Sequence, residues 1–215
     1  MALALYGKHP AKGDFLEVGL GGLKPALEGW LDAVLAEARH GLAEEWEQVW
    51  AAAPPLRFWL GPEIWGEPVA GVMIASADKV GRRFPLMILA TGADSPPAPV
   101  ITADQDWHNT VEAHLLAAKA LETLDLPADL LLGLAPDVLP ALPDGPGDFW
   151  AVRPGAEVAD LWADVAVTDH HRATRRRSYW WLEGGAAGWA QVWAGDGLPS
   201  GHVLAWFFRG YQEND

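Results

Sequence analysis

The stretch PVAGVMIASADKVGRRFPLMILATG (residues 68–92) decides the fold. It contains two almost continuously apolar runs, 68–78 and 84–92, separated by a glycine and two arginines. Such runs are typical of central strands that are covered on both faces. Asp78 and Gly81 favour a hairpin-like reversal between the runs. The sequence therefore predicts two neighbouring buried strands joined by a charged turn.

The remaining apolar patterns predict more strands and several helices. Strands are expected at 2–7 and 56–60, with candidates at DFWAVR (148–153), RSYWWLEG (177–184) and GWAQVWAG (188–195). Helical spacing over 27–38, 42–50 and 107–121 predicts helices there, the last opened by a capping box of Thr102 and Gln105. The segment 202–215 is expected to be helical. The expected fold is α/β, a mixed β-sheet with helices packed on both faces (a three-layer α/β sandwich), in one domain spanning 1–215.

Composition excludes several classes of function. The chain of 215 residues carries a formal charge of −14, which argues against nucleic acid as a partner because counterion release needs a basic face. It has no cysteine, so disulfides, thiolate metal sites and cysteine nucleophiles are excluded. Its apolar runs are too short for membrane insertion. A cytoplasmic protein is expected.

The N-terminal segment, GKHPAKGDF (residues 7–15), does not fit a nucleotide site. A phosphate-binding loop places a hydroxyl after its Gly-Lys pair, but here His9 and Pro10 follow, and Pro10 also lacks an amide donor. The nearby GLGGLK (19–24) has Lys24 where a dinucleotide fingerprint needs glycine. No cofactor is predicted.

Two groupings of polar residues suggest chemistry without a supporting motif. His9, Asp14 and Asp78 could serve a small hydrolase or phosphatase-like enzyme, which we keep as an alternative function although no nucleophile motif accompanies them. Asp169, His170 and His171 could bind a metal, but adjacent histidines point to different sides of a strand or helix. A solvated loop is the favoured interpretation of the latter group, and no metal site is predicted.

The arginine segment, SADKVGRRFPL (residues 76–86), places cations beside a buried strand end. Arg82 or Arg83 is expected near Asp14 or Asp78, where a guanidinium and a carboxylate can form a bidentate pair. Such a pair would either pin two loops together or form part of a partner-binding surface. Both interpretations stay open on the sequence.

A second basic cluster comprises Arg175, Arg176 and Arg177, with Arg172 shortly before them. It either binds a phosphorylated or acidic partner or forms a solvated turn before a strand. Trp180 and Trp181 follow directly and, among thirteen tryptophans, are the pair we expect to line a groove or interface.

The two segments together resemble a known family. Gly7, Lys8, Pro10, Gly13, Asp14 and Phe15 match the opening signature of the TagF (ImpM-like) accessory proteins of type VI secretion. A second signature of that family is matched by Ser76, Asp78, Gly81, Arg82, Phe84 and Pro85. SYWW (178–181) and GLP (197–199) resemble its C-terminal portion. The chain departs at His9, where the family more often has an apolar residue.

The resemblance implies an α/β sandwich and a cytoplasmic regulatory role without catalysis. Family members are understood as post-translational repressors of type VI secretion that act through a forkhead-associated scaffold protein and a threonine-phosphorylation pathway. Some relatives carry a PppA-type phosphatase domain, for which this chain is too short. No catalytic residue is implied.

The resemblance and the residue chemistry agree on the geometry of the two loops. We expect Gly13 to allow a positive φ and Phe15 to anchor its loop by burial. We also expect a polar cluster where the loops meet, formed by Lys8, Asp14, Asp78 and Arg82.

Overall fold

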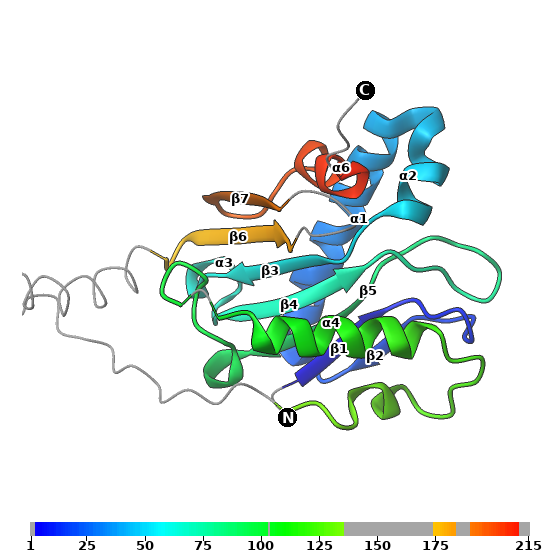
Figure 1. Cartoon of the computed structure of the whole chain (residues 1–215), viewed down its shortest axis with the longest axis horizontal. Helices are drawn as coiled ribbons and strands as arrows, with labels where there is room; N and C mark the ends of the chain where they lie inside the picture. The colour runs from blue at the N-terminus through cyan, green and yellow to red at the C-terminus, as the bar shows by residue number, and fades with distance from the viewer. Residues whose placement is uncertain (1–2, 103, 136–173, 184–189, 211–215) are drawn as a thin grey trace, which may run out of the picture.

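The structure is a computed structural model that describes residues 3–102, 104–135, 174–183 and 190–210 (Figure 1). Its centre is a seven-stranded sheet in the order β2-β1-β5-β4-β3-β6-β7. The strands are β1 (Leu3–Gly7), β2 (Leu16–Val18), β3 (Leu56–Leu60), β4 (Val69–Ile74), β5 (Leu86–Thr91), β6 (Arg177–Leu182) and β7 (Gln191–Asp196).

Helices cover both faces of this sheet. One face packs against α1 (Lys24–Leu42), α2 (Trp46–Ala52) and α6 (Gly201–Arg209), and the other against α4 (Asp106–Lys119). Figure 1 shows α4 in front of the sheet and α1 behind it. The short α3 (Pro62–Trp65) lies between β3 and β4. The expected α/β fold with helices on both faces is confirmed.

The strand directions differ from the mixed sheet that we expected. Every pairing between the strands of the described sheet is antiparallel. Parallel neighbours need a crossover of a dozen or more residues. The links that join β1 to β2, β3 to β4 and β4 to β5 are shorter than that, so each pair forms by simple reversal.

The apolar character of β4 and β5 follows from burial on both faces. Val72 and Ile88 belong to the core under α4, whereas Met73 and Met87 belong to the core under α1. Side chains alternate along a strand, so a strand between two helical layers must be apolar at successive positions. The prediction from residues 68–92 is confirmed.

The N-terminus of α4 differs from the expected capping box. Asp104 accepts the Asp106 backbone N–H at 2.9 Å through its carboxylate, while the Thr102 hydroxyl accepts the Asp104 N–H at 3.2 Å. Gln105 instead turns toward the sheet, where stronger donors are available.

Some expected elements lie outside the described residues. The candidate strand at 148–153 is among them, as are residues 136–147 and the end of the helix expected over 202–215. Among the described residues, no helix is both long enough and apolar enough to cross a lipid bilayer.

Candidate functional site

The N-terminal segment and the arginine segment lie side by side, because β1 pairs with β5. The backbone N–H of Lys8 donates to the Pro85 carbonyl at 3.1 Å, and that of Lys79 donates to the Lys12 carbonyl at 2.8 Å. The Arg82 Nη2 donates to the Gly13 carbonyl at 2.7 Å. Segments that are about seventy residues apart in the chain are thus joined by backbone and side-chain bonds.

The centre of this junction is the carboxylate of Asp78. Its Oδ2 accepts Lys8 Nζ at 3.0 Å and Arg82 Nε at 2.6 Å. Its Oδ1 accepts the backbone N–H groups of Val80 at 3.1 Å and of Arg82 at 2.9 Å. We call Lys8, Asp78 and Arg82 the clasp. The expected contact between Arg82 and Asp78 is present, but it lies within the arginine segment and uses Nε alone, so it is not the bidentate pair that we expected. The two loops are joined by Lys8, which bonds to Asp78, and by Arg82, which bonds to the Gly13 carbonyl.

The clasp keeps Asp78 ionised. Burial by itself would raise the pKa of this carboxyl, but the hydrogen bonds from Lys8, Arg82 and Val80 outweigh burial and hold the pKa well below its ordinary value. A carboxylate that is such a weak base and whose two oxygens are both occupied is poorly suited to accept a proton from a substrate. The Asp78 carboxylate is therefore suited to act as a structural anion.

Gly7 and Gly81 have backbone reasons for being glycine. A Cβ on Gly7 would lie 2.0 Å from the Pro85 carbonyl oxygen, and its φ is 131°. Gly81 has a φ of 85° and closes the turn by donating its N–H to the Asp78 carbonyl at 2.9 Å. Gly13 does not adopt a positive φ, contrary to our expectation. It contributes its carbonyl to Arg82 instead.

We expected Phe15 to be buried, but it is not, because its side of the loop faces outward. The residue is 46% exposed. Its ring contacts Tyr6 and Phe84 at centroid distances of 5.6 and 4.8 Å, and Lys8 Nζ lies 4.9 Å from its centroid. These contacts orient the ring and leave it at the surface beside the clasp.

Asp14 and Arg83 lie outside the clasp. Asp14 is exposed, and no hydrogen bond or ion pair joins its side chain to another described residue. Arg83 pairs with Glu47 of α2 rather than with Asp78. Successive residues of an extended segment point to opposite sides, so Arg82 and Arg83 cannot both reach the same carboxylate.

His9 is a fully buried anchor for the N-terminal segment. Its Nε2 lies 2.8 Å from the Ala118 carbonyl at the end of α4, and its Nδ1 accepts the Ala11 N–H at 3.1 Å. Pro10 sits in the turn closed by the Lys12 N–H and the His9 carbonyl. A histidine can replace an apolar residue here because both of its ring nitrogens find partners.

Ser76 contributes to the junction through its backbone. Its carbonyl accepts the Phe84 N–H at 3.2 Å and Trp50 Nε1 at 3.0 Å. Its buried hydroxyl has no hydrogen-bond partner among the described residues. The backbone bonds hold the base of the reversal against α2.

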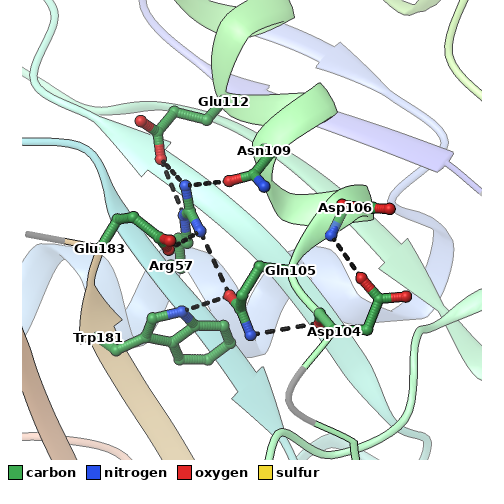
Figure 2. Close-up of polar contacts among 8 residues, drawn as sticks. All are labelled: Arg57, Asp104, Gln105, Asp106, Asn109, Glu112, Trp181 and Glu183. Carbon is green, nitrogen blue, oxygen red and sulfur yellow. Dashed lines mark hydrogen bonds and ion pairs between the residues drawn. The ribbon is translucent and has the colours of Figure 1, made fainter.

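A second polar cluster surrounds Arg57, which is only 2% exposed although it lies in the apolar strand β3 (Figure 2). Its Nε donates to Glu112 at 2.9 Å and its Nη2 to Asn109 at 2.9 Å. Its Nη1 donates to Gln105 at 3.3 Å and also pairs with Glu183. The cluster therefore ties β3 to α4 and to the end of β6. The cluster was not predicted from the sequence, although a charged residue inside LRFWL was an available signal.

His108 lies next to this cluster on α4. It is buried between the rings of Trp107 and Trp181. Burial, and then the charge of Arg57, lower the pKa of His108 to about 3. The ring is therefore neutral at neutral pH, as expected beside a buried guanidinium.

The second arginine cluster forms a turn before a strand, one of the two interpretations left open. Arg175 and Arg176 place their Nε atoms 3.2 and 3.6 Å from Glu63, and Arg177 pairs with Asp196 at 3.2 Å. All three side chains are substantially exposed. Exposed pairs of this kind contribute little to stability.

We expected Trp180 and Trp181 to line a groove, but they do not. Trp180 is fully buried and stacks on Phe58 at a centroid distance of 4.8 Å. Trp181 is 6% exposed and donates to Gln105 at 2.8 Å. Both lie in β6, whose two faces are covered, so both rings belong to the core.

The described residues contain no group of three or more His, Asp or Glu side chains that could hold a metal ion. The candidates Asp169, His170 and His171 lie outside the described part of the chain, as does Arg172.

The fold and the clasp define an α/β scaffold in which two loops are locked together by opposite charges. Residues 4–130 match the family model for the TagF N-terminal domain, type VI secretion system-associated. This match covers more than half of the chain, so the chain belongs to that family and is associated with type VI secretion. The resemblance inferred from the two segments is confirmed.

A solved structure has a similar fold over the full length of the chain. The crystal structure of PA0076 from Pseudomonas aeruginosa PAO1 is similar to this chain with a TM-score of 0.73 and 26% sequence identity. The alignment covers 100% of this chain and 97% of PA0076. No curated protein matches the sequence.

Proposed function

We propose that the chain is a non-catalytic accessory protein that represses type VI secretion after translation by binding a forkhead-associated scaffold protein. The observation that carries this proposal is the structural role of three residues from the family's two signatures. Lys8, Asp78 and Arg82 fasten two loops to each other and thereby fix the shape of an exposed surface. Such preorganisation favours recognition, because a surface that is already ordered loses less entropy on binding.

The surface held by the clasp has the chemistry of a protein interface. Phe15 is 46% and Val80 is 71% exposed, and the Arg82 side chain is 62% exposed. Aromatic and arginine side chains are enriched at the centres of interfaces. We call Phe15, Val80 and Arg82 the loop surface and propose it as the partner-binding face.

The alternative, a small hydrolase or phosphatase-like enzyme using His9, Asp14 and Asp78, has weaker support. His9 is buried against the end of α4, Asp78 is occupied by the clasp, and Asp14 is exposed. A general acid and a general base must face one bound substrate, each within hydrogen-bond reach of the atom that it protonates or deprotonates. These three residues are directed to different surroundings.

The proposal extends to the remaining features of the chain. We propose that residues 1–215 act as one TagF-like unit, which is supported by the pairing of β6 with β3 in a single sheet. The net charge of −14 supports a protein partner rather than nucleic acid, and we propose a cytoplasmic location for the chain. We propose neither membrane insertion nor a cofactor.

The test is binding of the forkhead-associated scaffold protein from the same organism, measured by calorimetry. We expect Phe15→Ala and Val80→Ser to weaken binding by about tenfold or more. Val80→Ser should leave the melting temperature nearly unchanged, whereas Phe15→Ala should lower it modestly because the ring loses its contacts with Tyr6 and Phe84. Val192→Ser is the matched control for Val80→Ser, since Val192 is 75% exposed and lies in β7, at the opposite edge of the sheet from β1. Failure of the wild type to bind the scaffold would refute the proposal.

A further inference from the structure

A hollow of about 370 Å³ lies where the arginine segment meets α1 and α2. Arg39 of α1 and Arg82 and Arg83 of the arginine segment contribute to its wall. Asp32 and Glu47 are the acidic residues that line it. We call this space the arginine hollow. With three guanidinium groups against two carboxylates, the lining has an excess of one positive charge in a chain of net charge −14.

Each of these arginines keeps donors that the described residues do not use. Arg82 is held by Asp78 and Gly13 through Nε and Nη2, and its Nη1 bonds to no described residue. Arg83 pairs with Glu47 through Nη2, but its buried Nε has no hydrogen-bond partner in the described part of the chain. Arg39 is exposed, and its guanidinium bonds to no described side chain. A buried unpaired donor is costly, so an acceptor brought by a ligand would be favoured at this position.

We infer that the arginine hollow binds a carboxylate or phosphate group carried by an acidic segment of a protein partner. The planar guanidinium fork matches the geometry of both oxyanions. The apolar rings of Trp46 and Phe84 line the same space and can contact the stem of the bound side chain. The volume lies within the range of sites that hold a side chain or small ligand.

A peptide segment fits the surroundings better than a free anion. A more open depression adjoins the arginine hollow along α1 and is lined by Ala36, Arg39, His40 and Ala43. Ala36 and Arg39 line both spaces, so a chain anchored by its acidic group in the hollow can continue along α1. Arg82 also belongs to the loop surface, which makes the two faces continuous.

This inference rests on the proposed function, because the acidic segment belongs to the partner. It names the contact that the partner makes.

Asp32 has a defined role in the arginine hollow. Its exposed carboxylate lines the hollow without an ion pair to a described residue, so it opposes an incoming anion. Removing the charge of Asp32 must therefore strengthen binding, whereas removing that of Arg39 must weaken it.

The direct test uses a fluorescein-labelled acidic peptide with one central phosphothreonine, and versions with glutamate or glutamine in its place. We expect the phosphothreonine and glutamate peptides to bind the full chain, as measured by fluorescence anisotropy, and the glutamine peptide to bind less. Arg39→Gln should weaken binding about tenfold, and Asp32→Asn should tighten it about two- to fivefold. Arg176→Gln is the control, since its side chain is 80% exposed and lies in the other arginine cluster.

The same four proteins are then tested against the forkhead-associated scaffold. If Arg39→Gln and Asp32→Asn bind both peptide and scaffold as the wild type does, the hollow is not the site, although the proposed function stands. If the peptide results follow expectation but the wild type does not bind the scaffold, the hollow is upheld as an anion site and the proposed function fails. If the wild type binds neither acidic peptide, or if Arg176→Gln weakens binding as much as Arg39→Gln, the inference is overturned.

Discussion

Gly7→Ala is the substitution whose cost follows most directly from the geometry of the junction. Gly7 is the last residue of β1 and lies opposite Leu86 of β5. The backbone N–H of the next residue, Lys8, donates to the Pro85 carbonyl. An added Cβ would stand 2.0 Å from the Pro85 oxygen and 2.8 Å from the Leu86 Cα. Both are backbone atoms, so the clash cannot be relieved by turning a side chain.

The magnitude has two parts. The backbones must separate by about an ångström at this point, an overpacking that costs about 1–3 kcal/mol. The φ of 131° is also unfavourable for alanine and adds about 1–3 kcal/mol. We therefore expect a loss of about 2–6 kcal/mol, which lowers the melting temperature by roughly 10 °C in a chain of this size.

The assay is urea unfolding followed by tryptophan fluorescence, with two other signature glycines as references. Gly13→Ala should change the free energy of unfolding by less than about 0.5 kcal/mol, because no described atom lies within 4 Å of its Cβ position and its φ is ordinary. Gly81→Ala should cost about 1 kcal/mol, since it has open space but a φ of 85°. The reasoning is refuted if Gly7→Ala is as stable as Gly13→Ala.

Three further predictions concern the core. Between about pH 6.5 and 4, His108 takes up a proton only when the chain unfolds. The free energy of unfolding should therefore fall by about 1.4 kcal/mol per pH unit as the pH drops through this window. His108→Leu should flatten that slope, and an unchanged slope would count against the burial of a neutral ring. Arg57→Met should cost about 3 kcal/mol in chemical denaturation because it leaves Glu112 without its cation, compared with less than about 0.5 kcal/mol for Arg176→Met. Gly71→Ala should lower the melting temperature clearly, since its Cβ would lie 2.5 Å from the Phe58 ring and 2.7 Å from a backbone oxygen; a melting temperature equal to that of the wild type would contradict this packing.

The parts of the fold that were predictable are those with a strong local signal. β4 and β5 were recognised because both faces are apolar, and α1 because Leu27, Leu31 and Val34 recur at helical spacing. The contact between Arg82 and Asp78 was also predictable, since the turn brings residues four apart together. In each case the interaction is local in sequence or follows from the period of one element.

The features that were not predicted depend on tertiary neighbours. Nothing local to LRFWL indicates that Arg57 meets Glu112 and Glu183, residues that arrive from α4 and from beyond β6. The same holds for Phe15, whose exposure is set by Tyr6 and Phe84 rather than by its own hydrophobicity. Sheet direction was mistaken because an apolar run shows that a strand is buried on both faces but not which way its neighbour runs.

The most direct measurement on the central claim, that Asp78 is held by two cations at once, is a double-mutant cycle with Lys8→Met and Arg82→Met. Each single variant leaves Asp78 one cationic partner, whereas the double variant leaves a buried carboxylate with backbone N–H groups alone. We predict that the double variant loses distinctly more stability than the sum of the two single losses. Strict additivity in urea unfolding would contradict the clasp.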